Sequence, residues 1–282
     1  SIAFDDGKRR VVLGPDDALW YRRARYAAQL PMNMDAQLRR ACLDESKTLL
    51  RGLMAAAPCF VFDGPDRVER NGHKPRQQQL ARELGLATPR TLMTRDAAQA
   101  ERFLRSCEHG AIAKMLSGFA IYSEDNTEQV VFTTALNEEH LRQLSGLRYC
   151  PMVFQERVEK KLELRITVIG SRMYAAAVDS QSMPGAEVDW RERGLTLLRA
   201  WSPYTLPADV EARLHAYMDR IGMQYSAIDM IVEPSGRHVF LEANPAGEFF
   251  WLEDNAPNLP LSAAIADVLT NQPGARRGAA RN

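Results

Sequence analysis

Three oxygen-bearing side chains near the C-terminus could together bind a metal ion: Asp229, Glu242 and Asn244. Two carboxylates and an amide oxygen are hard ligands that suit Mg²⁺, the ion that commonly holds nucleotide phosphates. The three residues belong to two β-rich runs, 227–232 and 239–245. The sequence therefore predicts a metal site, provided that the two runs bring these side chains to one face.

The segment between the two runs decides which side chains meet. Pro234, Ser235 and Gly236 are typical turn residues and predict a hairpin. With Pro234 and Ser235 as the two turn residues, Asp229 lies opposite Phe240. Alternation then places Phe240, Glu242 and Asn244 on the face of Asp229, and Val239, Leu241 and Ala243 on the other face. A slip of one residue would send Asp229 away from this face. An ordinary hairpin with a polar solvent face is the alternative.

Composition excludes several function classes. The 282 residues include 36 Lys or Arg and 36 Asp or Glu, so no bulk charge favours binding to nucleic acid or to a membrane surface. No apolar run approaches the ~18 residues of a membrane span, and the first residues do not resemble a signal peptide. The cysteines and histidines are scattered, without the spacing of a disulfide framework or a zinc site. These features are typical of a cytoplasmic protein with a substantial core.

The first part of the chain predicts a small α/β unit. Runs at 2–4 and 10–13 indicate a hairpin, residues 35–57 have helical spacing, and 60–62 indicate a short buried strand. A helix followed by a strand favours a parallel α/β layer. Residues 19–23 are interpreted as a strand that runs into a basic loop. Its two arginines, Arg22 and Arg23, either contact an anion or are solvated.

Helices and strands continue to alternate through the middle and the end of the chain. We expect helices at 76–84, 96–106, 137–145, 208–222 and 261–270, and strands at 111–116, 130–132 and 151–158. Lys114 shares a strand face with Ile112 and Leu116, where an unpaired ammonium group would be costly. An anionic partner is therefore needed, and an ATP phosphate would serve.

Glu163 and Arg165 project from one face of a second predicted hairpin. Its strands, 163–169 and 173–178, flank Gly170-Ser171, which is typical of a tight type II′ turn. A cross-strand salt bridge, worth ~0–1 kcal/mol if exposed, is the plain structural interpretation. Arg165 is also suited to phosphate, because its planar group can bind two oxygens at once.

The run from Ala227 to Glu253, AIDMIVEPSGRHVFLEANPAGEFFWLE, resembles the metal-binding end of ATP-grasp ligases. More narrowly, its Asn-Pro-x-Gly-Glu-x-x-Trp-Leu-Glu part is similar to the maturases of graspetides, the microviridin-type ribosomal peptides. Further motifs follow in the order of that family: Trp-Tyr-Arg-Arg at 20–23, LGL-x-x-PRTL at 84–92, Asp-Ser-Gln at 179–181 and Asp-Trp-Arg at 189–191. The resemblance extends from Trp20 to about Asn271.

The resemblance implies an α/β fold of the α+β ATP-grasp type, with ATP held between two subdomains. Residues 1–70 would form a partial α/β pre-ATP-grasp domain, and the family's first strand and helix, which precede its Trp-Tyr-Arg-Arg motif, are missing here, so we expect its start to be truncated. Residues 71–155 would form a small central subdomain, and 156–272 a C-terminal subdomain with an antiparallel sheet. Residues 273–282 would be a flexible tail.

The resemblance also implies roles for individual residues. Lys114, Arg165 and Arg191 would act in catalysis by neutralising the transferring phosphoryl group or acyl phosphate. ATP would be bound by Lys74, Lys114, Gln155, Glu156, Val158, Glu163 and Arg165. Two Mg²⁺ ions would be held by Asp229, Glu242 and Asn244. The substrate would be contacted by Arg22, Arg23, Asp179, Glu187 and Asp189. A loop that covers the phosphates would start at Ser117-Gly118-Phe119.

The implied activity is ATP-dependent macrocyclisation of a ribosomally made precursor peptide that has a leader and a core rich in acidic and hydroxyl residues. A carboxylate of the peptide would be activated as an acyl phosphate and joined to a Ser or Thr hydroxyl (ω-ester) or to a Lys amine (ω-amide). Family members are commonly homodimers, although the sequence itself is silent on this point. Two alternatives stay open: a ligase that adds a free amino acid to a small molecule or protein, and a non-catalytic nucleotide-binding module.

Overall fold

The computed structural model describes residues 2–22, 24, 30–31, 33–116, 120–122, 128–130, 133–190, 197–256 and 258–271. The helices are α1 (Ala36–Ala55), α2 (Pro65–Asn71), α3 (Lys74–Glu83), α4 (Ala97–Arg105), α5 (Glu138–Arg142), α7 (Ala208–Ile221), α8 (Phe250–Asn255) and α9 (Leu261–Asn271). The strands are β1 (Ile2–Asp5), β2 (Arg10–Leu13), β3 (Ala18–Trp20), β4 (Phe60–Phe62), β5 (Thr91–Thr94), β6 (Ala111–Lys114), β7 (Ala120–Tyr122), β8 (Glu128–Val130), β9 (Thr134–Ala135), β10 (Met152–Glu156), β11 (Leu162–Ile169), β12 (Arg172–Val178), β13 (Ser202–Tyr204), β14 (Tyr225–Val232) and β15 (His238–Asn244). Short 3-10 helices lie at Leu144–Arg148, Ser180–Ser182 and Leu198–Ala200.

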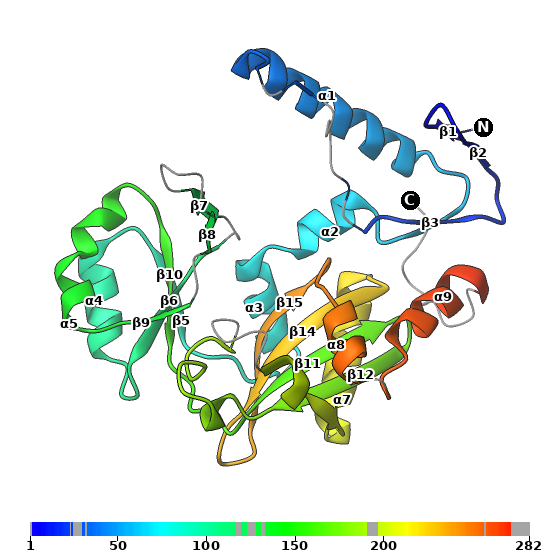
Figure 1. Ribbon diagram of the computed structural model, residues 1–282. Coiled ribbons are helices and arrows are strands. Elements are labelled where there is room, and N and C mark those ends of the chain that lie inside the picture. The colour runs from blue at the N-terminus through cyan, green and yellow to red at the C-terminus, as the bar shows by residue number, and fades with distance from the viewer. Residues whose placement is uncertain are drawn as a thin grey trace.

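The N-terminal part contains the predicted hairpin and the predicted parallel layer. β1 pairs with β2 in antiparallel fashion, and β3 pairs with β4 in parallel. The carboxylate of Asp35 caps α1, the long helix between β3 and β4, by accepting from two backbone N–H groups. Figure 1 shows α1 extending away from the rest of the molecule. Only Met54 of α1 is buried.

The central part is a four-stranded sheet in the order β5-β10-β6-β9, with antiparallel pairing throughout. The Asp96 carboxylate caps α4 by accepting from two backbone N–H groups, and the helix packs Ala100 and Leu104 against the sheet residues Ala113 and Phe154. The predicted strand at 111–116 ends at Lys114, and Leu116 is exposed beyond it. The prediction that Leu116 shares the strand face of Lys114 was therefore wrong, because the strand ends at Lys114. The predicted loop start at 117–119 and residues 131–132 lie outside the described residues, as does the predicted tail.

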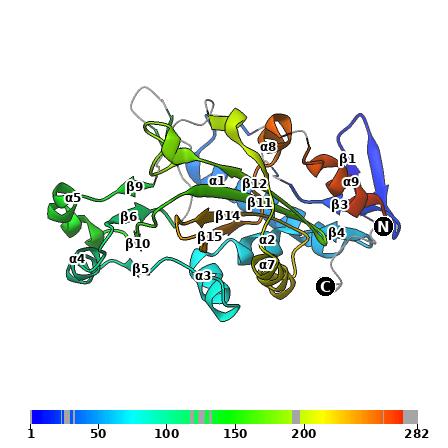
Figure 2. The same ribbon diagram turned by 90° about the horizontal axis from the view of Figure 1, so that it is seen from below.

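The C-terminal part is a five-stranded antiparallel sheet in the order β13-β12-β11-β14-β15. Helices α3 and α7 cover one of its faces, and α8 and α9 cover the other (Figure 2). The predicted tight turn is confirmed, because Ile169 pairs with Arg172 across two residues. Gly170 has a φ of +57°, and Ser171 does not share this left-handed region, as a type II′ turn requires.

Alternation along β11 separates core residues from site residues. Leu164, Ile166 and Val168 pack into the core under α3 and α7. Glu163 and Arg165 point to the opposite face, yet both are buried, with 8% and 9% of their surface exposed. Buried charges require partners, so this face of the sheet is where a polar site is expected.

The N-terminal part is docked to this sheet by a buried carboxylate. Asp63 follows β4 and is the one described non-glycine residue with a left-handed backbone, at φ +50°. Its oxygens accept from the backbone N–H groups of Gln224 and Tyr225, at the start of β14, over 2.7–3.0 Å. Burial raises the pKa of Asp63 to about 7, although these N–H donors and Arg67 act in the other direction.

Several local features were not predicted. The short helices α2 and α8 were missed, and α3 starts at Lys74 rather than at residue 76.

The four cysteines are free thiols. None of the helices among the described residues combines the length and the apolar character needed to cross a bilayer.

Candidate active site

A cavity of about 720 Å³ lies between the central sheet and the polar face of the five-stranded sheet. Its lining includes most of the residues singled out from the sequence: Lys74, Lys114, Gln155, Val158, Glu163, Arg165, Glu187, Asp189, Asp229, Glu242 and Asn244. They come from segments that lie up to 170 positions apart, from Lys74 to Asn244. The fold thus brings together site residues that lie in separate motifs along the sequence.

Five predicted site residues do not line this cavity in the described structure. Arg23 and Arg191 lie outside the described residues. Asp179 is exposed, and its carboxylate caps the 3-10 helix Ser180–Ser182. The Glu156 side chain lies 3.9 Å from Arg90, and both residues line a second hollow. Arg22 does not line the cavity but binds Glu248, which does.

The hairpin that carries the metal ligands has a different register from the predicted one. The turn comprises residues 233–237, so Met230 lies opposite Phe240, and a β-bulge follows between Met230 and Asp229. Because of the bulge, Asp229 pairs with Glu242. The predicted pairing of Asp229 with Phe240 was therefore wrong.

The bulge also changes which side chains share a face. Phe240 and Ala243 pack into the core beneath α7, whereas Leu241 lines the cavity with Glu242 and Asn244. The predicted grouping of Phe240 with the polar residues was wrong, because an extra residue interrupts the alternation. The predicted convergence of Asp229, Glu242 and Asn244 is nevertheless present.

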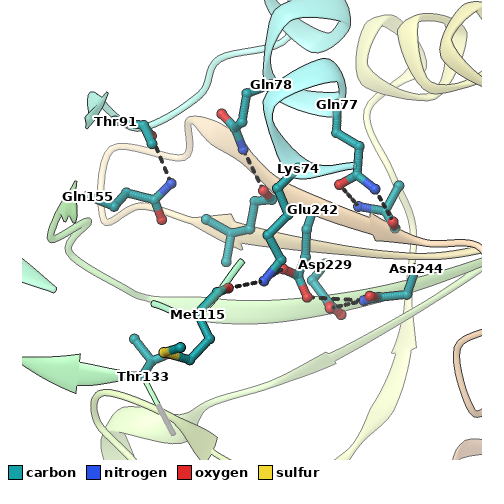
Figure 3. A network of polar contacts seen from close by, with 12 residues as sticks. Lys74, Gln77, Gln78, Thr91, Met115, Thr133, Gln155, Asp229, Glu242 and Asn244 are labelled. Atoms are coloured by element: carbon teal, nitrogen blue, oxygen red, sulfur yellow. Dashed lines mark hydrogen bonds and ion pairs between the residues drawn. The ribbon is translucent and has the colours of Figure 1, made fainter. Parts of the chain in front are cut away.

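Each oxygen of the two carboxylates lies within reach of a nitrogen atom, and Figure 3 shows the contacts that Lys74 and Asn244 make. Arg165 Nη1 lies 2.8 Å from Asp229 Oδ1. The Asn244 amide donates to Asp229 Oδ2 at 3.0 Å and to Glu242 Oε1 at 3.2 Å. Lys74 Nζ lies 3.2 Å from Glu242 Oε2 and donates to the Met115 carbonyl at 2.9 Å. The Lys74 side chain thus belongs to the cavity, although Lys74 is the first residue of α3.

The charges of this network reinforce one another. Burial is the largest influence on Glu242 and favours its neutral form, but Lys74 and Lys114 outweigh it and hold the pKa of this carboxyl well below its usual range. Burial lowers the pKa of Lys114, and Glu242 counteracts this effect. Glu242 is therefore ionised, as a metal ligand must be.

Two cationic groups in the cavity could each bind a further anion. Within the described part of the chain, the Lys114 side chain forms neither a hydrogen bond nor an ion pair, although it lines the cavity. The buried Nε of Arg165 likewise has no acceptor there. A nucleotide phosphate would satisfy both groups, so the residues present fit ATP. Asp229, Glu242 and Asn244 supply the hard oxygens that fit Mg²⁺, once the Asn244 amide turns its oxygen inward.

No group of three or more His, Cys, Asp or Glu among the described residues is placed to hold a metal. This agrees with the candidate site, because its third ligand is an asparagine.

The segment 155–158, here called the hinge, follows the central sheet and has a hydrogen-bond donor and an acceptor that could bind the adenine base. Val158 lines the cavity, and its backbone N–H donates to no acceptor in the described part of the chain. The Gln155 side chain donates to Thr91 Oγ1 at 3.0 Å, while its buried Oε1 has no donor. One donor and one acceptor are thus available at this end of the cavity.

Lys160 is a cavity residue that sequence reasoning missed. Its ammonium lies 3.0 Å from Glu163 Oε1 and donates to the Val188 carbonyl at 2.8 Å, so it joins β11 to the loop that carries Glu187 and Asp189. In the sequence it belongs to Glu159-Lys160-Lys161, a charged run that is usually a solvated surface. The only available signal was its position three residues before Glu163.

An aromatic group forms the other end of the cavity and was also missed. Trp190, Trp201 and Trp251 pack with ring centroids 5.3–5.4 Å apart, and Trp190 and Trp251 line the cavity. Beside them, Arg22 Nη2 lies 2.5 Å from Glu248 Oε2. The Arg22 guanidinium also packs over the rings of Trp20 and Phe249. Arg22 thus fixes the loop after β15.

Comparisons with known proteins agree with this geometry. Residues 1–69 match the family model described as the MvdD pre-ATP grasp domain. The chain is similar to macrocyclase MdnC from Microcystis aeruginosa MRC, solved with precursor peptide MdnA: identity is 42% over 95% of this chain and 82% of that chain, with a TM-score of 0.85. It is also similar to a RiPP-associated ATP-grasp ligase from Chryseobacterium gregarium, solved with ADP and a leader and core peptide. Here identity is 37% over 99% and 86% of the two chains, with a TM-score of 0.88.

A third similar structure is macrocyclase MdnB from Microcystis aeruginosa MRC, with 31% identity over 95% of this chain and 85% of that chain and a TM-score of 0.72. No match was found among curated proteins. Similarity at these levels extends over both sheets and the cavity between them. The chain therefore belongs to the ATP-grasp ligases that modify ribosomally made peptides, the graspetide macrocyclases.

Proposed function

We propose that this protein is an ATP-dependent macrocyclase of a ribosomally made precursor peptide. The observation that carries the proposal is the charged network in the cavity, where Lys114 and Arg165 face the carboxylates Asp229 and Glu242. The MdnC structure contains a precursor peptide, and the Chryseobacterium ligase contains ADP with leader and core peptides. Similar ligands would fit this cavity, which has a hinge, a cationic centre and an aromatic end.

The chemistry requires two transfers that this cavity could support. A peptide carboxylate attacks the γ-phosphorus of ATP, and ADP leaves. A hydroxyl or amine of the same peptide then attacks the acyl carbon, loses its proton, and phosphate leaves. Both steps develop negative charge on phosphate oxygens, so fixed cations lower the barrier. Lys74, Lys114 and Arg165 would supply this charge, and Arg191 is proposed to join them.

Each end of the cavity has a proposed role. The hinge groups of Gln155, Glu156 and Val158 would hold adenine, and Glu163 would approach the ribose. Asp229, Glu242 and Asn244 would hold Mg²⁺, which would stabilise the negative charge that develops on the phosphates. Five residues are proposed to contact the peptide: Arg22, Arg23, Asp179, Glu187 and Asp189.

Finer features of the proposal come from the family resemblance. We propose two Mg²⁺ ions, a peptide core with Ser, Thr or Lys as nucleophile, a homodimer and a cytoplasmic location. The division into a pre-ATP-grasp domain, a central subdomain and a C-terminal subdomain at residues 70 and 155 stays a prediction.

Mass spectrometry would test the reaction. The protein is incubated with Mg²⁺, ATP and a precursor peptide encoded beside it, and each ring formed should remove the mass of one water. Omission of ATP is the control. Unchanged peptide mass with every such precursor, despite nucleotide binding, would contradict the proposal and favour a non-catalytic binding module.

Release of ADP distinguishes the remaining alternative. A macrocyclase should release ADP in response to a peptide that carries its leader, whereas a ligase for free amino acids should respond to amino acids alone. The aromatic end of the cavity favours the peptide, because Trp190 and Trp251 offer a broad apolar surface beside the phosphate region.

A further inference from the structure

The four carboxylate oxygens of the proposed metal site are all occupied by nitrogen donors of the protein. Asp229 is held by Arg165 and Asn244. Glu242 is held by Asn244 and Lys74 (Figure 3). A Mg²⁺ ion that binds these oxygens must compete with the positive charge of the donors, above all with the Lys74 ammonium group at Glu242 Oε2.

Lys74 is the donor best placed to leave. Arg165 is anchored a second time, because its Nη2 donates to the Glu248 carbonyl at 3.0 Å. Asn244 can stay in place, since rotation of its amide replaces nitrogen by oxygen. Lys74 has a flexible stem at the start of α3, and 27% of its side chain is exposed. Its second contact is the Met115 carbonyl, which directly follows β6 of the four-stranded central sheet.

The charges of the network oppose the entry of a bare metal ion. Three cations, Lys74, Lys114 and Arg165, surround the two carboxylates, which leaves one positive charge in excess. Without a nucleotide, a displaced Lys74 would have no anion to bind. ATP brings several negative charges and offers oxygens to this lysine, so it removes both obstacles at once.

We infer that Lys74 takes the place of Mg²⁺ in the nucleotide-free enzyme and moves from Glu242 to the nucleotide phosphates when Mg²⁺ and ATP bind together. This inference rests on the proposed function, since it takes ATP as the ligand of this cavity. It makes the binding of metal and nucleotide strongly cooperative. By linkage, each ligand must raise the affinity for the other by the same factor.

Metal binding can be measured without turnover. Mn²⁺ replaces Mg²⁺, and free Mn²⁺ is followed by electron paramagnetic resonance during titration of the full chain, with and without a non-hydrolysable ATP analogue. The wild-type protein should bind Mn²⁺ at least ~10-fold more tightly in the presence of the analogue. In Lys74→Met, nucleotide-free binding should tighten ~10-fold, and the cooperativity should fall by the same factor.

Lys114→Met is the matched control. It removes the same charge from the same cavity, but Lys114 makes no direct contact with either carboxylate in the described structure. Its effect on nucleotide-free Mn²⁺ binding should therefore be clearly smaller. Equal tightening in the two variants, or none in Lys74→Met, would overturn the inference. Absence of analogue binding at every Mn²⁺ concentration would instead contradict the proposed function, and the inference with it.

Discussion

Gly247 lies directly against Arg165: a Cβ built on this glycine would stand 3.0 Å from Arg165 Nη2. It would also stand 2.6 Å from the Cβ of Ala227 and 3.2 Å from that of Asn244. Arg165 in turn holds Asp229 at 2.8 Å. The loop after β15 and the proposed metal ligands are therefore packed as one unit, in which a single methyl group has no room.

Gly247→Ala should consequently impair catalysis far more than folding. Overpacking costs ~1–3 kcal/mol of stability, whereas a shift of about 1 Å in the catalytic groups can cost ~100-fold in rate. We expect kcat/KM for cyclisation to fall by about that factor while the circular dichroism spectrum is unchanged. Gly52→Ala, in α1 with nothing within 4 Å of the added methyl, is the control. Full activity of Gly247→Ala would show that the loop is not coupled to Arg165.

The sequence could predict which residues converge here but not how the strands align. Period-two alternation grouped Glu242 and Asn244 on one face, because side chains two positions apart on a strand point the same way, and the hairpin brought Asp229 to that face. The sequence did not indicate the turn of residues 233–237 or the bulge between Asp229 and Met230, since an extra residue leaves no periodic signal of its own. Here the longer turn and the bulge together return Asp229 to the side of Glu242, which is why the predicted site survived a wrong register.

Long-range contacts limited the prediction in a different way. Asp63 directly follows the strand predicted at 60–62, yet its partners Gln224 and Tyr225 lie about 160 positions later in the sequence. Lys160 belonged to a charged run that looked solvated, and its contact with Val188 exists only after the loop folds back. No local pattern encodes such pairs, because they depend on how separate elements pack.

Replacement of either proposed metal ligand should abolish turnover without unfolding the protein. Asp229→Ala and Glu242→Ala each remove a hard oxygen ligand and leave Arg165 or Lys74 without its carboxylate. We expect cyclisation to fall by at least ~100-fold, measured as peptide product per unit time. Glu233→Ala, in the turn of the same hairpin, should retain activity. Near-normal cyclisation by either ligand variant would overturn the metal assignment.

Arg22 should act by holding the loop after β15. It binds the Glu248 side chain at 2.5 Å and the Ala246 carbonyl at 3.3 Å. Loss of one charged hydrogen bond of this kind is worth ~1.5–3 kcal/mol, so Arg22→Ala should lower kcat/KM by ~10-fold or more.

Lysine should not replace Arg22 fully, because it lacks the planar group that packs over Trp20 and Phe249. Arg10→Ala, on the exposed strand β2, is the matched control. If Arg22→Lys were fully active, charge alone would be sufficient and the packed guanidinium would not matter.

Asp63 should make the stability of the protein depend on pH. Burial raises its pKa from 3.8 to about 7 in the folded chain. Between these values the folded state holds a proton that the unfolded state has released, so the free energy of unfolding falls as pH rises. The contribution is complete below the unfolded pKa of 3.8 and is lost as pH passes the folded pKa of about 7.

Asp63→Asn keeps a carbonyl oxygen for the backbone N–H groups of β14 but cannot titrate. Chemical denaturation from about pH 5 to about pH 7 should therefore show wild type losing on the order of 2 kcal/mol relative to the variant. Comparing the two proteins at each pH cancels the titration of all other groups. Parallel stability curves would mean that Asp63 is ionised throughout this range, with the N–H donors of Gln224 and Tyr225 outweighing its burial.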